Sequence, residues 1–307
     1  MSTLLRKLIV ASWLAAPVAI PMSTVLDYVS ANAQRDELLV SAEWLSKHLR
    51  DANLVLLHVG ERKEYDAGHI PGAQFISMQD VSAPRPADPM SGQTLELPDP
   101  AGLRRRLETF GISDRSRIVV YYGSDWVSPS TRVVFTLDWI GLGDRTVLLN
   151  GGMPAWKANG GAIVTVAPVI KPGKLNARPV KSLVVDANWV QANARKPGYA
   201  LIDGRTAGFY DGAQKGMTKA GHIPGARNIP FTTVTDDSLR LESPAQLRQL
   251  FERAGIKNGD TVVGYCHIGQ QATAVLFAAR TLGHKVLLYD GSFHDWEMRD
   301  LPVETPK

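Results

Sequence analysis

The sequence predicts two copies of one α/β domain, each with a mainly parallel sheet flanked by helices. Two observations carry this prediction. Residues 67–73 (AGHIPGA) recur as residues 220–226, and the segments on either side match in the same order in both halves of the chain. Short apolar, β-branched runs alternate with helical patterns in each half, which is typical of parallel strands that are covered on both faces.

Local patterns place the strands and several helices. Buried strands are expected at residues 54–59, 118–122 and 146–149 of the first copy and at residues 200–203, 261–265 and 285–289 of the second. Ser243 and Pro244 predict the start of a helix, and Gly255 predicts its end. An alanine-rich helix is expected from about residue 271 to residue 282, where Gly283 stops it.

The composition is that of a globular chain with about two domains. Hydrophobic residues make up 44% of the 307 residues and charged residues 21%, and the net charge is +4. Lys and Arg form no dense run, so nucleic acid is not an expected partner. A mild positive charge is compatible with small anionic substrates.

The N-terminal segment has the three-part pattern of a secretory signal peptide. Arg6 and Lys7 precede an apolar run at residues 8–22, and Ala31 and Ala33 are small residues suited to a cleavage site. The apolar run is too short for comfortable membrane spanning, for which roughly 18 or more residues are needed. We expect cleavage after Ala33 and a periplasmic or secreted protein; the alternative is an uncleaved anchor that would bring the chain to a membrane.

These signals divide the chain into four predicted parts. The signal peptide covers residues 1–33, domain 1 covers residues 34–167, and domain 2 covers residues 182–307. Between the domains, residues 168–181 contain three prolines and few apolar residues, which predicts a semi-extended linker.

Cys266 is the candidate nucleophile. It is the single cysteine of the chain and directly follows the strand predicted at residues 261–265, just before a helix. Ligands of open α/β sheets bind at the carboxyl ends of strands. The unpaired N–H groups of a helix start favour an anion there, so we expect a cysteine with a lowered pKa that is partly thiolate near neutral pH. Gly269 would let the loop backbone close around the sulfur.

Together these motifs resemble the rhodanese family, whose tandem members include thiosulfate and 3-mercaptopyruvate sulfurtransferases. The resemblance is carried by the cysteine loop, the two GHIPGA motifs and the segment YDGSFHDW at residues 289–296. It implies a non-catalytic domain 1, which has no cysteine in its matching stretch at residues 119–126, and a catalytic domain 2. It also implies that Arg205 binds an anionic sulfur donor; the alternative is a surface or linker-facing salt bridge. Domain 1 has His58 where domain 2 has Asp203.

The resemblance assigns the loop residues His267, Ile268, Gly269, Gln270 and Gln271 to substrate binding. His267 could stabilise a thiolate or attract an anion, or it could point to solvent. The glutamines are expected to shape the loop or to donate hydrogen bonds to an oxyanion. The loop has neither the Arg or Lys typical of thiosulfate enzymes nor the Gly-Ser pair typical of 3-mercaptopyruvate enzymes, so both sulfur donors remain open.

His69 and His222 belong to the repeated motif, and we expect an architectural role for both. Both domains carry this histidine, whereas only domain 2 has a nucleophile. A residue that is shared with an inactive copy is better explained by the turn than by chemistry.

The predicted function is transfer of sulfane sulfur from an anionic donor such as thiosulfate to cyanide or a thiol, through a Cys266 persulfide. No metal or organic cofactor is implied. One alternative is a sulfur carrier or partner-binding protein with the same fold but without turnover. A rhodanese-like phosphatase is disfavoured, because Gln271 and Ala272 stand where such a loop needs an arginine to clamp phosphate.

Overall fold

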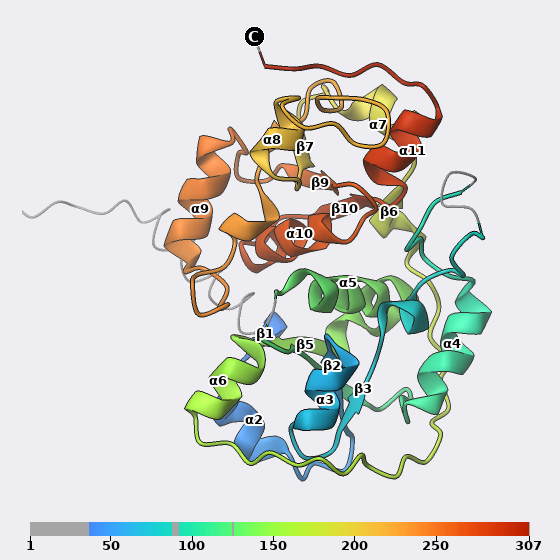
Figure 1. The fold of residues 1–307 in the computed structure, drawn as a ribbon, viewed down its shortest axis with the longest axis vertical. Coiled ribbons are helices and arrows are strands. Elements are labelled where there is room, and N and C mark those ends of the chain that lie inside the picture. Colours follow the sequence, from blue (N-terminus) through green and yellow to red (C-terminus); the bar gives the residue numbers. More distant parts are fainter. Residues whose placement is uncertain (1–36, 88–91, 125, 307) are drawn as a thin grey trace, which may run out of the picture.

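The structure is a computed structural model, and it describes residues 37–87, 92–124 and 126–306 (Figure 1). The predicted signal peptide at residues 1–33 lies outside the described residues. Two parallel five-stranded sheets, each flanked by helices, confirm the predicted fold class.

Domain 1 contains a five-stranded sheet in the order β1-β5-β4-β2-β3, and every pair of neighbouring strands is parallel. Its elements, in chain order, are β1 (Leu39–Val40), α2 (Ala42–His48), β2 (Leu54–Val59), α3 (Arg62–Ala67), β3 (Ala73–Phe75), α4 (Pro100–Thr109), β4 (Arg117–Tyr122), α5 (Ser128–Leu137), β5 (Thr146–Leu149) and α6 (Gly152–Ala158).

Domain 2 repeats this arrangement with the strand order β6-β10-β9-β7-β8. Its elements are β6 (Val184–Val185), α7 (Ala187–Asn193), β7 (Tyr199–Asp203), α8 (Ala207–Tyr210), β8 (Arg227–Asn228), α9 (Pro244–Arg253), β9 (Thr261–Tyr265), α10 (Gln271–Thr281), β10 (Val286–Tyr289) and α11 (Ser292–Met298). Single turns of 3₁₀ or π helix occur at Met78–Val81, Asp138–Leu142, Gly143–Arg145, Lys181–Leu183 and Phe231–Thr233.

All six strands expected from the sequence are present, with ends within one residue of the prediction. The four strands that the sequence patterns did not indicate are β1, β3, β6 and β8, which are two or three residues long. Each lies at a sheet edge. Such short segments carry no periodic signal of their own and become strands only by pairing with a longer neighbour.

Strand register gives the correspondence between the two domains. His58 pairs with Tyr121 in domain 1, and Asp203 pairs with Tyr265 in domain 2. The residue after each tyrosine is therefore equivalent, which places Tyr122 at the position of Cys266. Two residues beyond His58 and Asp203, Gly60 corresponds to Arg205.

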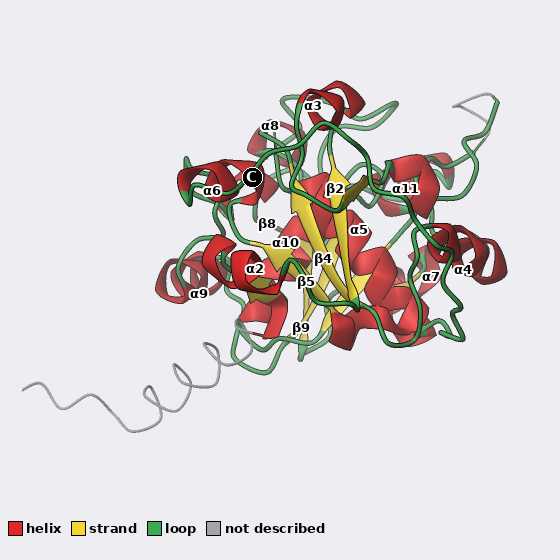
Figure 2. Cartoon of the chain, turned by 90° about the horizontal axis from the view of Figure 1, so that it is seen from below, coloured by secondary structure: helices red, strands yellow, loops and turns green. Residues whose placement is uncertain are grey.

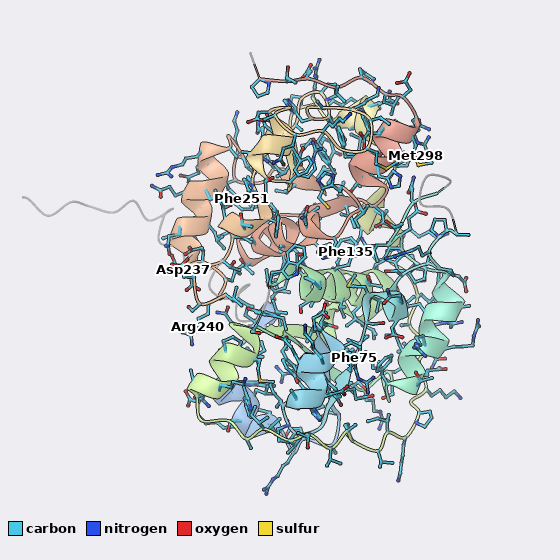
Figure 3. All side chains as sticks on the ribbon, viewed as in Figure 1. Phe75, Phe135, Asp237, Arg240, Phe251 and Met298 are labelled. Atoms are coloured by element: carbon cyan, nitrogen blue, oxygen red, sulfur yellow. The ribbon has the colours of Figure 1, made fainter. Side chains whose placement is uncertain are left out.

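The two domains share one continuous apolar core around the stacked helices α5 and α10, which lie at the centre of the molecule (Figure 1). Buried side chains from both helices belong to this cluster, and Phe135 of α5 is labelled within it in Figure 3. The hydroxyl oxygens of Thr131 and Thr273 are 3.0 Å apart across the helix pair. Arg280 donates to the Asp138 carboxylate at 2.7 Å, so polar contacts as well as packing join the domains.

A second apolar cluster covers the outer face of the domain 1 sheet, and a third covers the outer face of the domain 2 sheet. The view from below shows helices on both sides of the strands (Figure 2). This layering explains why the central strands are apolar along their whole length instead of alternating.

The segment predicted as a linker, residues 168–181, runs along domain 1 without regular structure until its last residue. It is tied down at several points. The Leu175 N–H donates to the Glu108 carboxylate at 2.9 Å, and the Val180 N–H donates to the Trp139 carbonyl at 2.6 Å. Leu175 is itself buried in the shared core. The segment therefore acts as a fixed strap and not as a free tether.

Candidate active site

Cys266 directly follows β9 and is the first residue of the loop that leads into α10. Figure 1 labels these two elements. Its side chain is completely buried, with 0% exposure. The backbone N–H groups of Ile268, Gln271 and Ala272 donate hydrogen bonds to its sulfur. These are donors of the loop and of the first turn of α10, so the expected anion cradle around the sulfur is present.

The expectation of a lowered pKa for Cys266 is wrong for this closed arrangement. Burial raises the pKa of the Cys266 thiol, the three backbone N–H groups act in the opposite direction, and the nearby Asp203 carboxylate adds to the increase. The free-energy cost of removing the thiolate from water is larger than the stabilisation that the three N–H groups give to it. The thiol form is therefore favoured until a ligand or a proton acceptor changes the surroundings.

The start of α11 holds the backbone of the cysteine loop. The N–H of Phe293 donates to the carbonyl of Cys266 at 3.0 Å, and the N–H of His294 donates to the carbonyl of His267 at 3.0 Å. The Ser292 hydroxyl accepts from the Cys266 N–H at 3.2 Å. Ser292 has a φ of 55°, an unfavourable conformation for this residue, and this turn directs the helix start at the loop.

Arg205 forms a buried ion pair with Asp203 beside the cysteine. Its Nε is 3.0 Å and its Nη2 2.6 Å from Asp203 carboxylate oxygens, and Nη2 also donates to the Gly221 carbonyl at 2.7 Å. The guanidinium carbon lies 3.9 Å from the centre of the Phe293 ring. Nη1 is buried and has no hydrogen-bond partner among the described residues. The alternative of a surface or linker-facing salt bridge is wrong, because Arg205 is buried and its partner is the buried Asp203. One nitrogen is left that could bind an anion.

The burial of Arg205 acts to lower the pKa of its guanidinium, but the hydrogen bond and charge of Asp203 outweigh this effect and the net shift is upward. The arginine therefore stays charged, and its charge is balanced by Asp203.

His267 lies at the edge of the site, where its ring meets Phe209 edge-on with the ring centres 4.4 Å apart. Burial, assisted by the charge of Arg205, lowers the pKa of His267 to about 4. The imidazole is therefore neutral near pH 7 and supplies no positive charge to stabilise a thiolate. It can still accept or donate one hydrogen bond.

The remaining predicted loop residues have distinct surroundings. Ile268 contributes its N–H to the sulfur, and its side chain is half-buried. The Gln270 amide donates to the Ser128 hydroxyl of domain 1 at 3.3 Å, so it shapes the loop against the other domain. The side-chain oxygen of Gln271 is buried and has no partner among the described residues.

Gly269 is required for a reason other than the one expected. It has a φ of 77°, and a Cβ atom there would lie 2.8 Å from the Asp290 carbonyl and 2.9 Å from Nη1 of Arg132. The close approach is to Asp290 and to a side chain of domain 1. Glycine is the residue that combines this left-handed backbone with no side chain.

Arg132 of α5 is a component of the site that the sequence analysis did not identify. It is fully buried, its Nη1 donates to the Gly269 carbonyl at 3.1 Å and to the Asp290 carboxylate at 2.6 Å, and its Nη2 donates to the Leu95 carbonyl. The one available signal was a single arginine within an otherwise apolar and hydroxyl-bearing helix. Its contact with the loop depends on how the domains pack, which no local pattern records.

His69 and His222 have matching surroundings that fit an architectural role. Each ring stacks on a tyrosine, Tyr65 or Tyr210, with ring centres 3.9 and 3.8 Å apart. Each Nδ1 lies 2.8 Å from the carbonyl oxygen of the same tyrosine. The arrangement is the same in the domain with the cysteine and in the domain without it.

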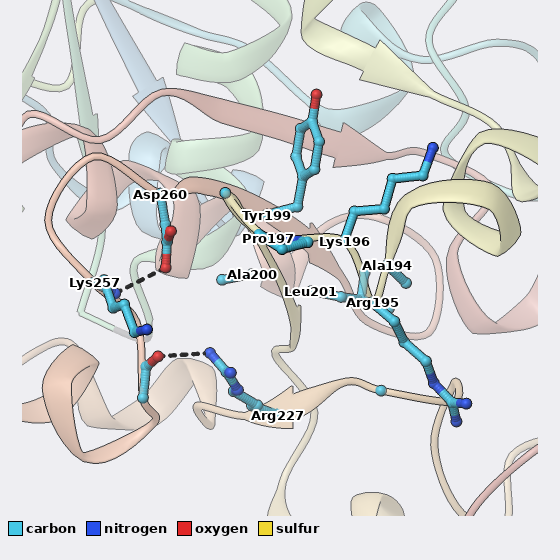
Figure 4. A pocket seen from close by; sticks show the side chains of 13 residues that line it. Ala194, Arg195, Lys196, Pro197, Tyr199, Ala200, Leu201, Arg227, Lys257 and Asp260 are labelled. Atoms are coloured by element: carbon cyan, nitrogen blue, oxygen red, sulfur yellow. Dashed lines mark hydrogen bonds between the residues drawn. The ribbon is translucent and has the colours of Figure 1, made fainter.

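A hollow of about 530 Å³ lies at the opposite end of the domain 2 sheet, where β7 begins (Figure 4). Arg195, Lys196, Arg227 and Lys257 line it, together with Asp260 and the first residues of β7. Asp203 is the last residue of that strand, and the cysteine loop follows the carboxyl end of the neighbouring β9. In the close-up Arg227 donates to the Gly255 carbonyl, at 2.7 Å. This basic hollow is therefore separate from the candidate active site.

Within the part of the chain that the structure describes, no three His, Cys, Asp or Glu side chains are grouped as metal ligands would be. No helix in the described ranges is both long and apolar enough to cross a membrane.

Comparison with known proteins identifies a family whose model matches both domains. The family model of the rhodanese-like domain matches residues 41–159 and 186–299. The two matches fall on the two sheets, and the second contains Cys266.

Several curated proteins are similar over more than four fifths of the chain. A probable 3-mercaptopyruvate sulfurtransferase of Pseudomonas aeruginosa is 34% identical, over 84% of this chain and 94% of its own length. The thiosulfate sulfurtransferase of Bos taurus is 31% identical, over 87% of this chain and 86% of its own. A sulfur carrier protein of Thermus thermophilus is also 31% identical, over 85% and 93%.

Solved structures are similar in fold. An anaerobic ergothioneine biosynthesis enzyme from Chlorobium limicola aligns with a TM-score of 0.77 over 90% of this chain and 71% of that one, at 21% identity. At this identity the likeness establishes the fold alone.

Proposed function

The chain belongs to the family of proteins with tandem rhodanese-like domains, and from this premise we propose that it is a sulfurtransferase that carries sulfur as a persulfide on Cys266. The observation that carries the proposal is the position of the cysteine sulfur in front of three backbone N–H groups at a helix start. A persulfide is an anion whose charge rests largely on its outer sulfur, and such a cradle favours anions.

The first step is attack of the Cys266 thiolate on the outer sulfur of a donor such as thiosulfate, after the thiol has lost its proton to solvent. The bond between the two thiosulfate sulfurs breaks, and sulfite leaves with the electron pair. In the second step cyanide or a thiolate attacks the outer sulfur of the persulfide. The sulfur–sulfur bond of the persulfide breaks, and the Cys266 thiolate is released with its electron pair.

Arg205 supports binding of an anionic sulfur donor. Its Nη1 is the guanidinium nitrogen without a partner among the described residues, while its other two nitrogens hold Asp203. A sulfonate or carboxylate oxygen of the donor would satisfy this nitrogen through a charge-assisted hydrogen bond. Thiosulfate and 3-mercaptopyruvate both offer such an oxygen.

Entry of the donor requires movement, because the Cys266 sulfur has no exposed surface. The half-buried rings of Phe209 and His267 meet beside the site and are the side chains whose displacement would open a path. Closure around a bound donor would then exclude water from the persulfide.

Mass spectrometry of the full chain after incubation with thiosulfate or with 3-mercaptopyruvate tests the proposal. We expect a gain of one sulfur atom on the Cys266 peptide, and loss of that sulfur on adding cyanide with formation of thiocyanate. Cys266→Ser is the matched control and should neither gain sulfur nor form thiocyanate. A sulfur carrier would load one sulfur but fail to turn over under excess donor and cyanide, and wild-type rates in Cys266→Ser would disprove the persulfide route.

We further propose that the protein is exported and cleaved after Ala33. The support is in the sequence: Arg6 and Lys7, a short apolar run and two small residues before the cut. N-terminal sequencing of the protein from fractionated cells tests it. A mature chain that starts at Gln34 in a non-cytoplasmic soluble fraction is expected, and a start at Met1 or Ser2 in the membrane fraction would contradict cleavage.

A further inference from the structure

Domain 1 has a cavity of about 360 Å³ at the end of its sheet that corresponds to the active-site end of domain 2. His58 at the end of β2 and Gly123, just after β4, form its floor, and helices α3 and α6 supply its walls. Its lining consists of His58, Glu64, Ala67, Gly68, Gly123, Ser124, Met153, Pro154, Lys157 and Ile163.

Several residues that line the cavity correspond to the residues that surround the Arg205 guanidinium in domain 2. Gly60 stands at the position of Arg205, so domain 1 has no side chain to fill this space. His58 replaces Asp203, the carboxylate that holds Arg205. The repeated motif places Gly68 at the position of Gly221, whose carbonyl accepts from Arg205. Met153 likewise replaces Phe293, the ring on which the guanidinium rests.

Buried polar atoms that line this cavity have no partner among the described residues. Both ring nitrogens of His58 and the Oε2 of Glu64 are in this state, and His58 is 1% exposed. A Cβ atom built on Gly60 would lie 3.4 Å from His58 Nε2 and 3.8 Å from Glu64 Oε2. The two orphan groups therefore converge on the space beside Gly60. Buried polar atoms in native proteins are almost always paired, with protein, water or a ligand.

Glu64 Oε2 is a hydrogen-bond acceptor, and the neutral ring of His58 has one acceptor nitrogen and one N–H donor. Glu64 accepts from the Ser124 hydroxyl through Oε1 at 2.6 Å, which leaves Oε2 available. Burial lowers the pKa of His58 to about 4, against the opposing effect of Glu64, so its ring is neutral and has a lone pair to offer. Lys157 lies at the rim and is exposed, so water screens its repulsion of a cation.

We propose that this cavity of domain 1 binds a small organic cation of the guanidinium type, held by Glu64 and His58 in the place of the missing arginine. The planar group would donate to Glu64 Oε2 and to a ring nitrogen of His58. Met153, Pro154 and Ile163 offer apolar surface to its faces, as Phe293 does for Arg205 in domain 2.

Methylguanidinium is the probe, titrated against the full-length protein by ligand-observed NMR. We expect saturable binding at one site, and no competition from tetramethylammonium, which has the charge but no N–H donor. Glu64→Gln keeps the shape of the side chain and removes its charge, and it should weaken binding by about tenfold or more. Lys157→Ala removes a like charge from the rim and should strengthen binding about twofold.

Sulfur transfer by the same variants is the folding control, because Glu64 and Lys157 lie in the other domain from Cys266. If Glu64→Gln fails to fold, His58→Phe is the second variant: its ring suits the surrounding rings of Tyr65, Phe75 and Tyr121, and it should also abolish binding. Absence of saturable binding to the wild type would overturn the proposal. Equally strong binding of methylguanidinium by Glu64→Gln would also overturn it. Binding of acetate that is weakened by Lys157→Ala would overturn it as well, because that result would identify an anion site.

Discussion

Nη1 of Arg132, in the domain without a cysteine, donates to the carbonyl of Gly269 in the cysteine loop of the other domain, at 3.1 Å. The same nitrogen holds Asp290 at 2.6 Å, and Asp290 accepts in turn from the Leu97 N–H at 2.8 Å. Gln93 of domain 1 also reaches Asp295 of α11, at 2.6 Å. Domain 1 thus contacts both the cysteine loop and the helix that supports it, which gives domain 1 a structural role at the candidate active site.

The hairpin at residues 235–241 makes the reverse contact, from domain 2 to domain 1. Tyr122, which stands at the position of Cys266, donates to the Leu239 carbonyl at 2.5 Å, and the Leu241 N–H donates to the Asn150 side chain at 2.9 Å. Figure 3 shows Arg240 of this hairpin beside α6 and Asp237 nearer to α9. In domain 1 the residue at the position of the nucleophile, Tyr122, therefore stabilises the domain interface.

Arg132 should act as a positioning residue. Arg132→Met is expected to lower kcat more than it raises KM for thiosulfate, because the loop that presents the N–H groups to the sulfur loses its anchor. It also leaves the Asp290 carboxylate without its cationic partner, although the Leu97 N–H remains, and this should lower the free energy of unfolding by roughly 3 kcal/mol or more. The double variant Arg132→Met with Asp290→Asn separates the two effects: it should recover stability but not kcat. Recovery of both would reduce Arg132 to a stabilising residue.

Arg205→Lys should impair the sulfur-donor step selectively. Lysine keeps a positive charge near Asp203 but cannot supply a second nitrogen in the place of Nη1. We expect kcat/KM for thiosulfate to fall by about tenfold to a hundredfold, the range for loss of one charge-assisted hydrogen bond, and the cyanide step to change little. Stopped-flow measurement of the two half-reactions decides this, and an unchanged donor step would leave Arg205 as a purely structural partner of Asp203.

The rate of persulfide formation should rise with pH across the neutral and alkaline range. Burial raises the pKa of Cys266 above its ordinary value, so the thiolate fraction of the free protein is small near pH 7 and increases as the pH rises. Single-turnover loading with thiosulfate at constant ionic strength measures the profile. A rate that is already at its plateau below pH 7 would mean that the open form of the site lowers this pKa.

His58 should make the fold sensitive to acid. Its pKa falls from 6.5 to about 4 on folding, so the folded state binds fewer protons than the unfolded state between these values. The stabilising contribution is therefore present above pH 6.5 and is lost as the pH drops toward 4, by at most about 3 kcal/mol. Urea unfolding at pH 7 and pH 5 should show a smaller difference for His58→Phe than for the wild type.

Local pattern was sufficient for much of this protein. The duplicated AGHIPGA motif indicated two domains, continuous apolar runs indicated the six central strands, and the position of Cys266 between a strand and a helix made it the candidate nucleophile. These features depend on residues close together in the chain, so the order of residues alone carries them.

Tertiary structure decided the rest, because the relevant contacts join residues far apart in sequence. Whether Cys266 is thiol or thiolate depends on how completely its surroundings exclude water, and packing proved it fully buried. Arg132 reaches Gly269 across 137 positions of sequence because α5 and α10 stack. The sequence shows that Gly60 stands where domain 2 has Arg205. Whether this missing side chain leaves a cavity depends on how the neighbouring helices of domain 1 pack around the space, which only the tertiary structure shows.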